Sequence, residues 1–170
     1  MSLHKTSIML DQAKMVVTNT TPLIALTAAT GSLEVLRALY ARVVVPYEVM
    51  QEIKVGGKES FGLDVFRQAS WLEISDAPVV LPPYLQNTLD LGEASVIQTA
   101  LQLGIHRVCI DETIGRRIAR LSNLVVTGSI GILLKAKSAG HPVSMPDAIN
   151  RMRERGIWLG KDVINFALKH

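Results

Sequence analysis

Two short β-branched runs each end at a residue with a side-chain oxygen, and a helix-compatible segment follows each of them. The first run covers residues 16–18 and ends at Asn19, and the second covers 108–110 and ends at Asp111. In open α/β folds, ligands bind beyond the carboxyl ends of parallel strands. The pattern therefore predicts that Asn19 and Asp111 point into one crevice, where a charged ligand or a metal ion could bind.

Two further carboxylates fall at suitable element boundaries. Glu93 opens a helix, one turn before the buried positions Val96 and Ile97. Glu52 lies on the helix after the second strand, although Glu48, one turn earlier on the same face, could point inward instead. Converging carboxylates repel one another unless a hard cation lies between them, and Mg²⁺ or Mn²⁺ accepts oxygen ligands.

This arrangement could orient and deprotonate a water molecule for in-line attack on a phosphodiester. We predict a catalytic set consisting of Asp111, Glu93, Glu52 and Asn19. Within it, Asp111, Glu93 and Asn19 are the predicted metal ligands. Substrate contacts are assigned to Arg116, Thr20 and Ser129, with the Arg116 guanidinium on phosphate.

Each residue also has a structural alternative. Asn19 could cap the helix that follows it, Asp111 could do the same before Thr113, and Glu93 is favoured in a first helical turn by the helix dipole. Glu112 is expected to face solvent or to pair with Arg116 four residues later. Arg151, Arg153 and Arg155 are expected to serve solubility, unless the C-terminal segment wraps a strand of RNA. Trp71 and Trp158 are expected to serve core or interface packing.

Strands and helices alternate from residue 15 onward, which predicts a mostly parallel sheet covered by helices. Strands are predicted at 15–18, 42–45, 71–75, 107–110 and 124–127. Helices are predicted at 22–29, 32–40, 46–54, 59–69, 84–89, 93–103, 113–121, 129–139, 146–155 and 160–169. Residues 1–14 are predicted to be an N-terminal leader, 15–140 the domain, and 141–170 a C-terminal helical extension whose apolar stripe suggests a homodimer.

The composition narrows the class of protein. Hydrophobic residues make up 48% of the 170 residues and charged residues 19%, which argues against disorder, and the apolar runs are too short to span a bilayer. A single cysteine and no recognisable secretory signal lead us to expect a cytoplasmic protein. The net charge of +3 is compatible with nucleic acid but does not require it.

The order and spacing of these motifs resemble PIN-domain nucleases, in the branch of small prokaryotic PIN-like proteins related to toxin–antitoxin ribonucleases. The resemblance covers about residues 15–140 and rests on 19–24, Val45-Pro46, 91–94, Ile110-Asp111-Glu112 with 115–117, and 126–131. It implies a three-layer α/β/α sandwich, Mg²⁺- or Mn²⁺-dependent cleavage of single-stranded RNA, and a small antitoxin-like partner.

Asn19 departs from that family, in which an aspartate usually follows the first strand. An amide oxygen can still bind a hard cation, but it carries no charge. One alternative is therefore a catalytically impaired module that binds nucleic acid or protein. Another is a regulator that binds phosphate at the glycine-containing turn over residues 127–131.

Overall fold

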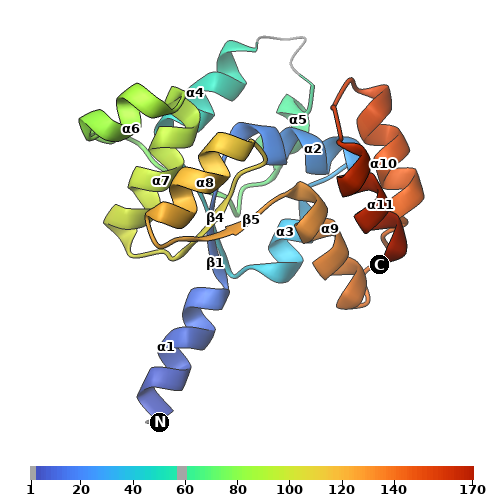
Figure 1. The fold of residues 1–170 in the computed structure, drawn as a ribbon, viewed down its shortest axis with the longest axis horizontal. Helices are drawn as coiled ribbons and strands as arrows, with labels where there is room; N and C mark the ends of the chain where they lie inside the picture. Colours follow the sequence, from blue (N-terminus) through green and yellow to red (C-terminus); the bar gives the residue numbers. More distant parts are fainter. Residues whose placement is uncertain (1–2, 57–60) are drawn as a thin grey trace.

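The computed structural model describes residues 3–56 and 61–170 (Figure 1). Its strands are β1 Met15–Thr18, β2 Arg42–Val45, β3 Glu73–Ile74, β4 Arg107–Cys109 and β5 Val125–Thr127. Its helices are α1 Leu3–Ala13, α2 Thr20–Thr30, α3 Glu34–Leu39, α4 Tyr47–Val55, α5 Leu63–Gln68, α6 Pro83–Thr88, α7 Leu91–Leu103, α8 Thr113–Leu121, α9 Ser129–Ser138, α10 Met145–Glu154 and α11 Lys161–Lys169.

The strands form one parallel sheet in the order β3-β2-β1-β4-β5. Central strands of this kind are buried on both faces, which explains why Val16, Val17, Val44 and Val108 are fully or almost fully buried. Helices α4, α6, α7 and α8 pack with one another on one side of the sheet, and α2, α3, α9, α10 and α11 pack together on the other (Figure 1). The predicted three-layer α/β/α sandwich is confirmed.

The chain order reverses between β1 and β4, because β2 and β3 lie on one side of β1 while β4 and β5 lie on the other. Backbone pairing continues just beyond the strands: the Asn19 N–H donates to the Cys109 carbonyl (3.1 Å), and the Ile110 N–H donates to the Thr127 carbonyl (3.0 Å). Asn19, Asp111 and Gly128 therefore leave the same edge of the sheet. This is the switch point at which open α/β folds bind ligands.

Most predicted elements are present within a few residues of their predicted ends. The predicted strand over 71–75 is reduced to β3, and part of the helix predicted over 59–69 falls on residues 57–60, outside the described residues. Helix α1 has no counterpart among the predictions, because its apolar residues follow no regular helical repeat. It is fixed to the domain near its end, where the Gln12 side chain donates to the Gly104 carbonyl (2.9 Å) and accepts from the His106 N–H (3.1 Å).

The C-terminal helices pack on the domain through both apolar and basic residues. Met152 is buried in α10, and Arg151 donates to the Ala29 carbonyl at the end of α2 (3.1 Å). The Arg155 guanidinium lies 3.9 Å from the centre of the Phe61 ring. All three arginines of this segment are exposed, as expected for solubility, and Arg151 and Arg155 in addition contact the domain.

The two tryptophans differ in their surroundings. Trp71 is partly buried against the core, as expected for packing. Trp158 is 86% exposed, so it is not a core residue of this chain. In α11 the apolar residues divide: Ile164 and Ala167 are buried, while the large residues Val163, Phe166 and Leu168 are exposed. The division into a domain ending at residue 140 and an extension stays a prediction.

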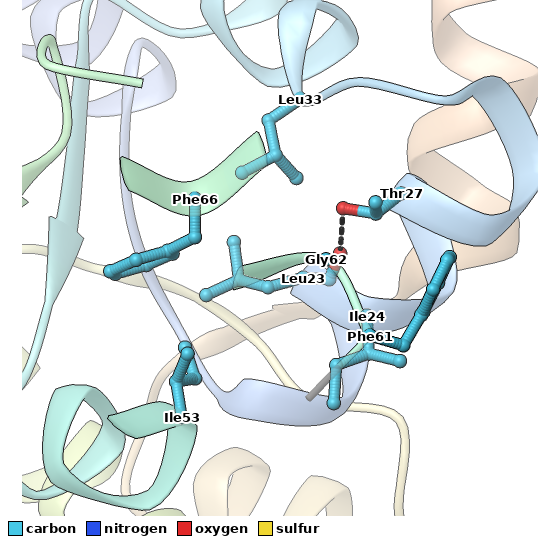
Figure 2. A pocket seen from close by; sticks show the side chains of 8 residues that line it. All are labelled: Leu23, Ile24, Thr27, Leu33, Ile53, Phe61, Gly62 and Phe66. Atoms are coloured by element: carbon cyan, nitrogen blue, oxygen red, sulfur yellow. Dashed lines mark hydrogen bonds between the residues drawn. The ribbon is translucent and has the colours of Figure 1, made fainter. Parts of the chain in front are cut away.

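One cavity lies between α2, α4 and α5 (Figure 2). It measures about 20 Å³, and the only side-chain oxygen in its lining, that of Thr27, donates to the Leu23 carbonyl of its own helix (2.8 Å). An apolar void of this size offers a polar ligand no partners. This cavity is therefore not a candidate site for a polar ligand.

None of the described helices is both long enough and apolar enough to cross a membrane.

Candidate active site

Asn19 and Glu52 meet beside the first turn of α7. A β-carbon placed on Gly92 would lie 3.0 Å from Asn19 Oδ1, 3.0 Å from Glu52 Oε2 and 3.5 Å from Asp90 Oδ1. Three oxygen atoms from three different segments thus surround one point that only a glycine leaves free. The structure therefore brings the residue after β1 together with the helix that follows β2.

The Asn19 side chain is buried but does not cap α2. Asn19 is the residue that precedes the helix and is only 4% exposed, yet it makes no capping hydrogen bond. Its Oδ1 has no hydrogen-bond partner among the described residues. Leaving a buried acceptor unpaired costs free energy, so such an atom is expected to bind a donor, a water molecule or an ion. An oxygen atom in this state is suited to bind a cation or a substrate donor.

The structure distinguishes Glu52 from Glu48. Glu52 Oε2 accepts a hydrogen bond from the Thr20 hydroxyl (2.8 Å), next to Asn19. Glu48 is buried one turn earlier, where its Oε1 accepts from the Val79 N–H (2.8 Å) and so anchors the segment that follows β3. Glu52 is therefore the carboxylate that faces Asn19.

Asp111 lies against the start of α9. Its Oδ1 accepts a hydrogen bond from the Ser129 N–H (2.8 Å). Burial raises the pKa of the Asp111 carboxyl, and the hydrogen bonds from Ser129 oppose that rise. Beside it, Arg116 Nη1 donates to the Ile110 carbonyl (2.8 Å). Asp111 is thus held by backbone, with a guanidinium group close to it.

Thr20 and Ser129 were predicted to contact substrate, and the structure shows how their donors are used. The Thr20 hydroxyl is donated to Glu52, and the Ser129 amide is donated to Asp111. The first amide of α9 is therefore already hydrogen-bonded to the carboxylate of Asp111. This arrangement disfavours the alternative in which the turn over 127–131 is a primary phosphate site, because a bound phosphate would compete with Asp111 for the same amide.

Glu93 lies in the first turn of α7 and is only 6% exposed. Its N–H donates to Asp90 Oδ1 (2.8 Å), so Asp90 caps the helix. Burial, together with the charges of Asp90 and Glu112, raises the pKa of the Glu93 carboxyl to about 7. A β-carbon on Gly115 of α8 would lie 2.7 Å from Glu93 Oε1, so that glycine lets α8 approach the carboxylate.

Glu112 was expected to face solvent or to pair with Arg116, and the structure shows that this expectation is wrong. Glu112 Oε1 accepts a hydrogen bond from the Thr21 hydroxyl (2.6 Å), and the buried Oε2 has no partner among the described residues. The chain leaves β4 after Cys109, so strand alternation no longer decides where Glu112 points. Its orientation is set by the contact with Thr21 at the start of α2, for which the sequence around Glu112 carries no signal.

The side-chain oxygen atoms at this edge of the sheet are of the chemical types that bind a hard cation. All are carboxylate or amide oxygens, and two buried ones, Asn19 Oδ1 and Glu112 Oε2, have no partner. In the part of the chain that the structure describes, no three acidic, histidine or cysteine side chains are grouped closely enough to hold an ion as they stand. Binding a cation would therefore require the carboxylates to move closer together.

Stability measurements should detect the unfavourable burial of Glu93. Because its pKa rises from 4.5 to about 7 on folding, the folded state binds the proton more tightly than the unfolded state does. The Glu93 contribution therefore makes the metal-free protein less stable as pH rises between those values. In urea unfolding with EDTA, Glu93→Gln should be about 1–2 kcal/mol more stable than wild type at pH 8 and similar to it at pH 4.

The matched control is Glu34→Gln, which changes an exposed carboxylate and should leave the pH dependence unchanged. If Glu93→Gln and wild type lose stability equally between pH 4 and pH 8, the charge of Glu93 is not disfavoured by folding.

Comparison with known proteins gives one family and no curated relative. The model of the family DUF3368, described as a PIN domain, matches residues 15–170, from the first residue of β1 to the last residue given. No curated protein matches the chain. The family match spans the sheet, all the site residues described above and both C-terminal helices. This chain therefore belongs to the PIN-domain family.

Proposed function

We propose that this protein is a metal-dependent endoribonuclease that hydrolyses phosphodiester bonds in single-stranded RNA. The observation that carries the proposal is the buried Asn19 Oδ1, which has no partner and lies beside Glu52 at the switch point of the sheet. Membership of the PIN-domain family supports a nuclease in general. The positive net charge of +3 is compatible with a polyanionic substrate.

Asp111, Glu93, Glu52 and Asn19 would hold Mg²⁺ or Mn²⁺. When bound, the cation would lower the pKa of a water molecule and stabilise negative charge on the phosphate and the leaving oxygen. Thr20 and Ser129 orient Glu52 and Asp111 by donating hydrogen bonds to them. We assign both residues a positioning role in addition to the predicted contact with substrate.

Arg116 would bind the phosphate beside Asp111. Its Nη1 is fixed on the Ile110 carbonyl, which places the guanidinium next to the carboxylate without forming an ion pair among the described residues. A guanidinium group held in this way still has N–H donors to offer a phosphate oxygen.

A second candidate function is a PIN-domain module that binds nucleic acid or protein without cleaving it. The observation in its favour is Asn19 itself, since an amide at this position removes one charge from the site. The two functions differ in one result: the module would bind RNA and leave it intact in the presence of Mn²⁺.

We also propose a partner, either a second copy of the chain or a small antitoxin-like protein. Support comes from the exposed side chains of Trp158, Val163 and Phe166 near the end of the chain, which a partner could cover.

We also propose a cytoplasmic location. The single cysteine, Cys109, is buried and cannot form an internal disulfide, which agrees with that location.

The nuclease proposal predicts cleavage that depends on both metal and strand. We expect an unstructured, end-labelled RNA to be cut internally in 1 mM Mn²⁺ or Mg²⁺, to survive in EDTA, and to be cut at least ~10-fold more slowly within a duplex. Gel analysis of product lengths measures this result. RNA that binds but stays intact with both metals would contradict the nuclease and support the binding module.

A further inference from the structure

A second cavity lies at the opposite end of α2 from the candidate site. Its volume is about 360 Å³, which is enough for a small ligand or for one unit of a larger one. Residues from three segments line it, among them Ala28 and Gly31 of α2, Phe61, and Arg151, Glu154 and Arg155 at the end of α10. Gly31 and the three residues from the end of α10 are exposed, so the cavity opens to solvent.

Helix α2 connects this cavity to the candidate site along one face. The residues on that face are three or four positions apart: Thr21, Ile24, Ala28 and Gly31. Thr21 contacts Glu112 at the site, and Ile24 is partly exposed between the two ends. Over this stretch the helix rises by about 15 Å, and Figure 1 shows it running from the end of β1 to α10. A polymer bound at the site could therefore reach the cavity along α2.

We propose that the cavity binds a flanking nucleotide of the single-stranded RNA whose phosphodiester is cleaved at the site. The inference rests on the proposed function, because both concern the same RNA strand. Two features of the α10 residues favour this occupant.

The first feature is a pair of guanidinium groups with donors to spare. Arg151 and Arg155 are four residues apart and so share a face of the chain at the end of α10. Neither forms an ion pair among the described residues. Arg151 donates one N–H to the Ala29 carbonyl (3.1 Å), which leaves its other N–H groups for a ligand. Two exposed guanidinium groups of this kind suit the oxygens of a phosphate.

The second feature is an aromatic ring that positions one of these groups. The Arg155 guanidinium lies over the Phe61 ring, 3.9 Å from its centre, yet Arg155 remains exposed. Nucleic-acid bases stack on guanidinium planes as well as on aromatic rings. An acidic peptide would offer negative charge but no base to stack. The combination therefore favours a nucleotide over a peptide.

Binding of a fluorescently labelled oligouridylate of about 12 nucleotides, measured by anisotropy in EDTA, tests this contact without cleavage. We expect Arg155→Gln to weaken binding by ~5-fold or more. The slope of log K against log salt should fall in magnitude by about 0.7, the value for one phosphate contact on a single strand. Arg155→Lys, which keeps the charge but not the planar group, should keep the slope and recover only part of the affinity.

Arg153→Gln is the matched control, because it removes the same charge from an exposed residue of α10 that does not line the cavity. Its affinity should stay within ~2-fold of wild type, since distant exposed charges are screened by salt. Glu154→Gln removes a carboxylate from the lining and should tighten binding, a gain that unfolding cannot produce. Circular dichroism should confirm that all variants are folded.

Equal affinities and slopes for wild type and Arg155→Gln would overturn the role of the cavity and leave the nuclease proposal in place. Equal losses in Arg155→Gln and Arg153→Gln would also overturn it, because only the net charge of α10 would then matter. Displacement of the RNA by an oligoglutamate of equal charge would assign the cavity to an acidic protein instead. If wild type does not bind the oligonucleotide, the inference fails, and if it also does not cleave it in Mn²⁺, the proposed function fails too.

Discussion

Replacing Asp111 by asparagine is expected to slow RNA cleavage by about 100-fold or more while the protein stays folded. Asparagine has nearly the same shape, and its Oδ1 can still accept the hydrogen bond from the Ser129 N–H. What the change removes is the negative charge that would hold the cation. A loss of kcat with an intact structure would therefore assign a chemical role to Asp111.

The expected stability of this variant makes the result informative. Burial raises the pKa of the Asp111 carboxyl, so its charged form is disfavoured by folding at neutral pH. In EDTA the melting temperature of Asp111→Asn should therefore equal or exceed that of wild type. A fall in activity together with a higher melting temperature cannot be explained by unfolding.

Asp147→Asn is the matched control, because Asp147 is an exposed aspartate in the first turn of α10 on another part of the molecule. It should cut RNA at the wild-type rate. Because both variants are purified in the same way, they also detect contaminating ribonuclease. Equal cleavage by Asp111→Asn and wild type would place catalysis elsewhere or attribute it to a contaminant.

The sheet could be predicted from sequence because its determinants are local. Runs such as Val43-Val44-Val45 have no polar side chains, and each is followed by a helix, which in α/β folds implies parallel strands buried on both faces. The convergence of Asn19 with Glu52 was also within reach. It follows from the general rule that functional residues collect where the strand order reverses.

The remaining features depend on contacts between distant segments. Glu112 could not be placed, because its orientation is set by Thr21, a residue 91 positions earlier in the chain. The same holds for Arg151, whose partner is the carbonyl of Ala29. Periodicity describes which face of an element is apolar, but it does not say which polar group lies opposite. Such pairings depend on how the helices pack against one another, which the sequence pattern does not specify.

Gly128 is the second position at which a small change should have a large effect. It precedes α9 with φ −138° and ψ 177°, an extended conformation that alanine adopts easily. Alanine at this position would instead clash sterically, since its β-carbon would lie 2.7 Å from Arg116 Nη1 and 2.8 Å from Asp111 Oδ1. Both atoms belong to the proposed site. Gly128→Ala must therefore displace the carboxylate, the guanidinium or both.

We expect Gly128→Ala to lower RNA cleavage by about 10–100-fold, because a shift of about 1 Å in a reacting group can cost that much. Gly160→Ala is the matched control: Gly160 also precedes a helix in extended conformation, and its β-carbon would meet only the Trp158 ring at an ordinary 3.5 Å. That variant should keep full activity and lose at most about 0.5 kcal/mol of stability. If both variants behave alike, the close approach of Gly128 to Asp111 has no part in the reaction. If only Gly128→Ala loses activity, the alignment of Asp111 with Arg116 is needed for cleavage, and adding Arg116→Lys, which keeps the positive charge but removes the planar guanidinium, should not restore it.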